Sequence, residues 1–151
     1  MKLAEALLLR ADMQNKLDSL NGRVKRNAVV QEGSTPHEDA SELIKEAFQI
    51  IAEKQALITK INQANLSNKL SSGLTLTEAL AERERLEEQH SLLNHAIYHT
   101  QTEPDRYSSR EIRWVSTLKV TSLQKQSEDL AKKIRELNII IQEANWSAEV
   151  A

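Results

Sequence analysis

The chain has 151 residues, a formal net charge of −2 at pH 7 and no cysteine. The balance of charge excludes the basic surface of a dedicated nucleic-acid-binding protein, and the lack of cysteine excludes disulfides and thiolate-ligated metals. Hydrophobic residues make up 40% of the chain, which is too many for a disordered protein. The length predicts a single domain over residues 1–151. No stretch is apolar enough to span a membrane, so we expect a cytoplasmic protein without a membrane partner.

In four segments, mainly apolar residues recur at alternating steps of three and four, which is the spacing of an a/d seam on a helix. In chain order the seam positions are 3, 6, 10, 13, 17, 20 and 24; 43, 47, 50, 54, 57, 61 and 64; 76, 79, 83, 86, 90, 93 and 97; and 123, 127, 130, 134, 137, 141 and 144. The sequence therefore predicts four helices of roughly 24 residues each.

The second half of the chain repeats the first. Seven residues recur unchanged 73 positions later, among them Leu3, Glu5 and Ala6 as Leu76, Glu78 and Ala79, and Met13 recurs as the similar Leu86. From Leu43 to Ser67, six more recur unchanged 80 positions later, and Ile50 recurs as Leu130. A fixed period indicates two copies of one unit, about 2–67 and 75–147. We expect an all-α fold, an antiparallel four-helix bundle built from two pseudo-symmetric helical hairpins.

The helix ends have recognisable signals. Thr75 and Glu78 form a capping box for the third helix. Two boxes compete for the start of the second helix, one beginning at Thr35 and the other at Asp39. Asn65 and Asn145 follow the last seam residues, where asparagine can adopt the left-handed C-cap conformation.

Both connections within the hairpins contain alternating apolar and polar residues. The stretches are 24–31 and 112–120, and in an up-down arrangement both would lie at the same end of the bundle. This alternation is typical of strands. It predicts a small β-ribbon formed by the two connections, with extended loops or frayed helix ends as the alternative.

Polar residues interrupt the seams at equivalent positions. Arg10 and Arg83 are 73 positions apart, and Asn65 and Asn145 are 80 apart. These four residues are the candidate ligand-binding site, an anion-binding layer near one end of the bundle. The alternative is a polar layer that fixes the register of the helices.

The sequence contains no recognisable metal or catalytic site. A Glu-x-x-His pattern, which di-iron bundles use on two helices, occurs once, at Glu87 and His90. His95 and His99 share a helix face, but no third ligand is evident. A nucleophile elbow and a phosphate-binding glycine-rich loop are also missing. We therefore predict no cofactor, no metal and no catalytic residues, which favours a non-enzymatic role.

The candidate interface residues are Phe48, Tyr107 and Trp114, because aromatic side chains are enriched at interface cores. The helices also have wider apolar stripes than one core requires. We expect a homo-oligomer, or a protein that binds another protein. The alternative is an enzyme or small-anion binder that uses the Arg10 and Arg83 layer or the connections rich in Arg, Tyr and Trp. Acidic residues nearly match the basic ones there, so nucleic-acid binding is not expected.

Four motifs together resemble a family of short bacterial proteins labelled septicolysin. They are Met1–Leu7, Asn27–Gly33, Leu74–Leu80 and Asn145–Ser147. The resemblance spans essentially the whole chain. It implies a bacterial protein of unknown function and carries over no catalytic residues.

Overall fold

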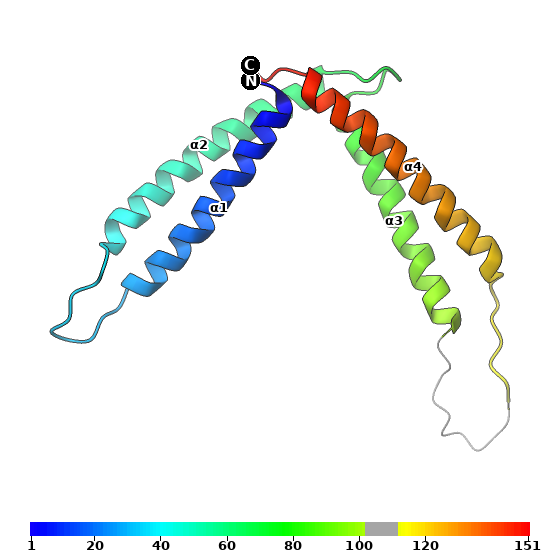
Figure 1. Cartoon of the computed structure of the whole chain (residues 1–151), viewed down its shortest axis with the longest axis horizontal. Coiled ribbons are helices and arrows are strands. Elements are labelled where there is room, and N and C mark those ends of the chain that lie inside the picture. The colour runs from blue at the N-terminus through cyan, green and yellow to red at the C-terminus, as the bar shows by residue number, and fades with distance from the viewer. Residues whose placement is uncertain (102–111) are drawn as a thin grey trace. The chain divides into compact units, whose positions relative to one another are not determined.

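The structure is a computed structural model that describes residues 1–101 and 112–151. Those ranges contain four helices (Figure 1), which are α1 (Leu3–Asn27), α2 (Ala40–Ser67), α3 (Leu76–Gln101) and α4 (Val120–Ser147). The described residues form no strand. The predicted all-α class is therefore confirmed.

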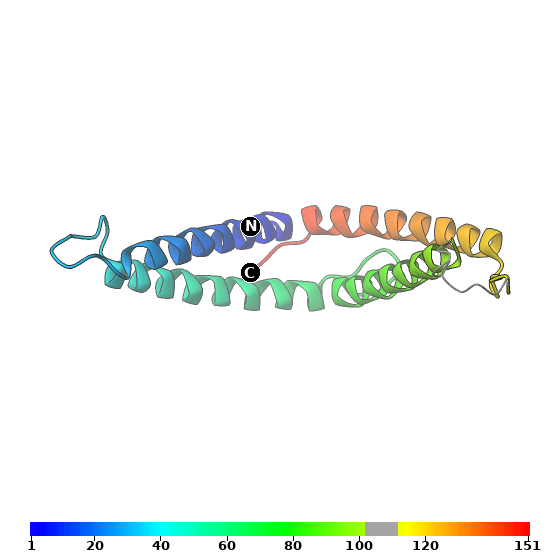
Figure 2. The same cartoon turned by 90° about the horizontal axis from the view of Figure 1, so that it is seen from below.

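The helices pair as two antiparallel hairpins, α1 with α2 and α3 with α4 (Figures 1 and 2). The chain divides into two compact units, residues 1–75 with 142–151, and residues 76–141. The last turns of α4 thus belong to the first unit. The helix bounds follow the two sequence offsets, because α3 begins 73 positions after α1, and α4 begins and ends 80 positions after α2. Helix packing of the kind expected in a bundle is present.

The predicted seam is the least exposed part of each helix. Its buried members in the first hairpin are Leu3, Ala6, Leu20, Leu43, Leu57, Ile61 and Ala64. In the second hairpin the buried members are Leu76, Ala79, Leu86 and Ile141. Arg10 is the exception, since its side chain is exposed. Burial of one apolar stripe therefore holds each pair of helices together.

The middle of α4 is less buried than the middle of α2. Leu57 is 7% exposed, whereas its equivalent Leu137 is only half-buried. Equivalent positions in the middle of two seams predict that both side chains are almost fully buried, and this prediction is wrong for Leu137. Its neighbour Asn138 accepts a 3.0 Å hydrogen bond from Arg83, and the equivalent of Asn138 in α2 is Ile58. A polar contact thus stands beside Leu137 where the first hairpin has an apolar side chain.

The helix ends correct two predictions. α2 begins at Ala40 because Asp39 is its N-cap, with Oδ1 accepting from the Ser41 amide at 2.8 Å. The competing box at Thr35 lies in the connection. Asn65 and Asn145 are not left-handed C-caps, since α2 runs to Ser67 and α4 runs to Ser147. Every described residue with positive φ is a glycine.

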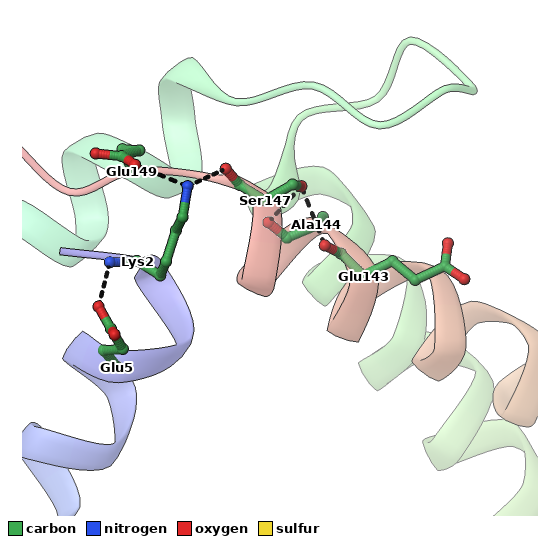
Figure 3. A network of polar contacts seen from close by, with 6 residues as sticks. All are labelled: Lys2, Glu5, Glu143, Ala144, Ser147 and Glu149. Carbon is green, nitrogen blue, oxygen red and sulfur yellow. Dashed lines mark hydrogen bonds and ion pairs between the residues drawn. The ribbon is translucent and has the colours of Figure 1, made fainter.

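Hydrogen bonds continue past Asn65 and Asn145 at the ends of both helices. Ser67 Oγ donates to the carbonyl of Gln63 at 2.9 Å, and Asn68 N donates to the carbonyl of Ala64 at 3.0 Å. Ser147 Oγ makes the same contact with the carbonyl of Glu143 at 3.0 Å (Figure 3). The amides of Asn68 and Ala148, just beyond the two helices, give the carbonyls of Ala64 and Ala144 a partner.

The predicted β-ribbon is absent from the described residues. Residues 24–27 form the end of α1, and residues 112–116 have no regular structure. Alternation of side chains favours a strand only when a second strand is available to complete the hydrogen bonds. Among the described residues, backbone pairing outside the helices is limited to two isolated bridges, Lys2 with Glu149 and Lys69 with Thr75.

These two bridges are equivalent under the sequence offsets. Val150 N donates to the carbonyl of Met1 at 2.9 Å, and Leu70 N donates to the carbonyl of Leu74 at 2.8 Å. Figure 3 shows the first bridge, with the Lys2 amine between Glu149 and the Ser147 carbonyl. The backbone pairing between the two chain ends therefore matches the pairing within the connection between α2 and α3.

Candidate functional site

An apolar groove runs between α1 and α2. Its volume is about 320 Å³. The lining residues are Gln14, Leu17, Asp18, Asn21 and Val24 of α1, and Ile44, Ala47, Phe48 and Ile51 of α2. The α2 side is entirely apolar, whereas the α1 side alternates apolar and polar groups. The groove therefore combines an apolar wall on α2 with a partly polar wall on α1.

Three residues of α2 dominate this groove. Ile44, Phe48 and Ile51, here called the α2 stripe, are 40%, 68% and 50% exposed. Their spacing of four and three places them on one face of the helix. Large apolar side chains gathered on one exposed face are unusual unless another surface covers them. The stripe is the strongest candidate for a functional surface.

The second hairpin lacks this stripe. The positions equivalent to Ile44, Phe48 and Ile51 in α4 are Gln124, Glu128 and Ala131. Since α2 and α4 have the same length and occupy matching positions in their hairpins, the hairpin architecture does not require large apolar residues there. A hairpin of this kind therefore forms in α3 and α4 without a comparable stripe.

A different groove lies between α3 and α4, with a volume of about 390 Å³. Its lining is mixed, and consists of Gln89, Leu92, Leu93, Gln126, Asp129, Leu130 and Lys133. Leu92 is 70% exposed, but polar and charged side chains flank it. The residues of the first hairpin that correspond to this lining are on the face opposite the α2 stripe. This groove is therefore not a second copy of the stripe.

The predicted ligand-binding residues have different environments. Arg10 is exposed, Asn65 is half-buried and Asn145 is buried at 7% exposure. Arg83 bonds Asn138 across its own hairpin. The alternative, a polar layer that fixes the register of the helices, stays a prediction. Arg10 and Arg83 belong to different compact units, and neither hairpin gathers the four residues into one cluster.

The predicted interface residues are exposed where the structure describes them. Phe48 is 68% and Trp114 is 77% exposed, while Tyr107 lies outside the described residues. Trp114 stands in the connection before α4 with Ile112 and Val115, which are 83% and 72% exposed. Phe48 differs from Trp114 because it lies on a regular helix beside a defined groove.

Two polar contacts were not predicted. Arg23 forms an ion pair with Glu38, and the Glu38 amide donates to Asn27 Oδ1 at 3.1 Å. These bonds join the end of α1 to the residue before the cap of α2. The pairing of Lys2 with Glu149 at 2.7 Å is the other. The repeat could have revealed it, because residues 148–150 stand 80 positions after 68–70.

Three carboxylates in the described part of the chain have a lowered pKa. The guanidinium of Arg23 holds the pKa of Glu38 below its usual range, mainly through a hydrogen bond. Arg85 lowers the pKa of Glu82 and Lys2 lowers that of Glu149 by the same cause. A lowered carboxylate pKa stabilises the charged form and does not supply a proton donor near neutral pH.

The described residues also lack a metal site and a membrane-spanning helix. No group of three or more His, Cys, Asp or Glu residues there could hold a metal ion. Nδ1 of His90, the histidine of the Glu-x-x-His pattern, lies 3.3 Å from Nδ2 of Asn94. No helix in the described ranges has the length and apolar character needed to cross a membrane.

Comparisons with known proteins place the chain among uncharacterised relatives. Residues 10–150 match a family described as "Family of unknown function (DUF6847)". A crystal structure of a functionally unknown conserved protein from Corynebacterium diphtheriae is 33% identical, with a TM-score of 0.92, and the alignment covers 100% of this chain and 99% of that one. No curated protein matches the chain. The resemblance is thus confirmed as far as an uncharacterised family, and nothing in the comparisons supports the septicolysin label.

Proposed function

We propose that this chain, which belongs to the family of unknown function DUF6847, is a non-enzymatic helical protein that assembles with further copies of itself. The observation that carries the proposal is the exposed α2 stripe beside its groove. The absence of a comparable stripe from the equivalent face of α4 supports a dedicated role for it.

Physical chemistry favours covering the stripe. Each square ångström of apolar surface removed from water contributes about 25 cal/mol, and phenylalanine has one of the largest apolar side chains. Two helices alone bury one seam and leave their remaining apolar residues in solvent. A second pair of helices laid on the same face would bury these residues as a four-helix bundle does.

Three finer features belong to the same proposal. The chain consists of two copies of one hairpin unit, about 2–67 and 75–147, within a single domain, which the matching helix bounds support. The seams have coiled-coil character, supported by their heptad spacing. The protein is cytoplasmic, in keeping with its charge-rich composition of 28% Asp, Glu, Lys and Arg.

The mass of the protein in solution tests the proposal. We expect light scattering of the wild type to give a multiple of the 17.1 kDa chain mass at micromolar concentration. Phe48→Glu should reduce that mass because it places a charge on the stripe. Leu92→Glu is the matched control, since Leu92 is equally exposed on the other hairpin, and it should leave the mass unchanged. A wild type of single-chain mass at every concentration would contradict self-assembly.

A further inference from the structure

The connection between α1 and α2 is fastened at its base by three side chains. We propose that Arg23, Asn27 and Glu38, here called the clamp, hold residues 28–38 in one conformation, and that release of the clamp frees this connection as a unit while α1 and α2 stay paired. The inference concerns one chain by itself, so it does not depend on the self-assembly proposed above.

An ion pair forms the first part of the clamp. Nε of Arg23 donates to Oε2 of Glu38 at 2.9 Å and to Oε1 at 3.2 Å, and a terminal nitrogen of the same guanidinium also donates to Oε1. The guanidinium therefore binds both oxygens of the carboxylate, a geometry that fixes the orientation of the two groups as well as their distance. Both side chains are half-buried, so water competes less with this pair than with a fully solvated one.

Asn27 forms the second part of the clamp. Its Nδ2 donates to the Arg23 carbonyl at 2.8 Å, and its Oδ1 accepts from the Glu38 amide at 3.1 Å. The side chain thus joins the last turn of α1 to the residue that precedes Asp39, the N-cap of α2. Because Glu38 offers its carboxylate to Arg23 and its amide to Asn27, loss of either contact should weaken the other.

The rest of the connection lies at the surface. Each residue from 28 to 37 is exposed, and a backbone hydrogen bond within this stretch runs from Ser34 N to the Gln31 carbonyl at 2.9 Å. Segments that bury little apolar surface open at a low cost in free energy. The helix pair differs, because the seam residues Leu20 and Leu43 next to the connection are buried. The clamp can therefore open without separating the helices.

The second hairpin has no such clamp at the equivalent positions. The residues there are Ala96, Thr100 and Leu118. None of them is charged, so no ion pair can form among them. Helices α3 and α4 nevertheless pair as a hairpin. Two helices of this chain can therefore pair without a clamp, in line with the expectation that its release leaves α1 and α2 together.

The charges around the clamp favour its release when position 38 is neutral. The guanidinium of Arg23 lowers the pKa of Glu38 most, through its hydrogen bond, and the positive charges of Arg26 and His37 lower it further. Glu46 of α2 also acts on Arg23. A neutral side chain at position 38 would leave the like charges of Arg23 and Arg26 with one carboxylate fewer. Glu38→Gln should therefore open the clamp with little change in side-chain size.

Amide hydrogen exchange measured by NMR tests the clamp residue by residue. The amides of Ser34 and Glu38 are both hydrogen-bonded, so both are protected from exchange while the connection is closed. We expect Glu38→Gln and, separately, Asn27→Ala to reduce the protection of the amides at positions 34 and 38 several-fold. The amides of Leu20 and Leu43 should keep their wild-type protection.

Glu42→Gln is the matched control. It removes the carboxylate partner of Lys45 in the first turn of α2, outside the clamp, and should leave the protection of Ser34 unchanged. Loss of protection at position 38 alone would show that the connection does not open as a unit, and would overturn the proposal. Equal losses at Leu20 and Leu43 would mean that the helices separate, which would overturn it as well. So would unchanged protection in both variants, or a Ser34 amide that is unprotected in the wild type.

Discussion

The amine of Lys2 lies 2.7 Å from the carboxylate of Glu149, although 147 positions separate the two residues. Backbone hydrogen bonds flank this ion pair on both sides, from Leu3 N to the Ala148 carbonyl and from Val150 N to the Met1 carbonyl, each at 2.9 Å. The C-terminal tail is therefore an integral part of the first compact unit.

Removal of residues 148–151 should destabilise the first unit. Ala148 and Val150 are each 7% exposed, and burial of a valine with two hydrogen bonds stabilises the fold by about 3 kcal/mol. Urea unfolding followed by circular dichroism measures the loss. Glu149→Gln is the matched comparison and should have a much smaller effect, because the ion pair is exposed to solvent. Equal losses in the two variants would contradict this account of the tail.

A circular permutant tests the equivalence of the two bridges. A short Ser-Gly linker would join Ala151 to Met1. The new chain ends would be made between Ser71 and Gly73, in the connection between α2 and α3. Because Val150 already pairs with Met1 as Leu70 pairs with Leu74, we expect the permutant to fold with the helix content of the wild type. A permutant without cooperative unfolding would show that the two bridges are not interchangeable.

Truncation of the two equivalent seam leucines should have unequal effects. Leu57→Ala removes a side chain that is 7% exposed, and such a cavity costs about 2–5 kcal/mol. Leu137 is half-buried, so Leu137→Ala should cost less than this range. Urea unfolding of both variants at one protein concentration makes the comparison. An equal or larger loss for Leu137→Ala would mean that its surroundings are tighter than the structure indicates.

The ion pair of Arg23 with Glu38 should make the free energy of unfolding depend on pH in the acidic range. Since the pKa of Glu38 is lower in the folded state, its contribution is present above the ordinary pKa of 4.5 and is lost as the pH falls through the folded-state value. Urea midpoints measured from neutral to acidic pH should therefore fall less steeply in Glu38→Gln than in the wild type. Parallel curves for the two proteins would rule out this contribution.

The sequence predicted the seams because burial on a helix depends on the period of its apolar residues. Leu57 and Ile61 are buried where that period places them. It failed at the helix ends, where backbone hydrogen bonds continue past Asn65 and Asn145 and the helices end at Ser67 and Ser147.

Contacts across a hairpin were also beyond the sequence. The spacing identified Arg83 as a seam residue, but it did not reveal that Asn138 would face it. The predicted ribbon failed because a local alternation cannot supply a partner strand. The sequence predicted a surplus of apolar residues on the helices. Only the structure shows that Phe48 lies beside a groove.

Sedimentation equilibrium of the wild-type protein over a wide concentration range tests self-assembly most directly. We predict a mass that rises from the 17.1 kDa of one chain towards a multiple of it as concentration increases, with the rise weakened or abolished in Phe48→Glu. A single-chain mass at every concentration, or a rise that Phe48→Glu leaves unchanged, would contradict assembly through the α2 stripe.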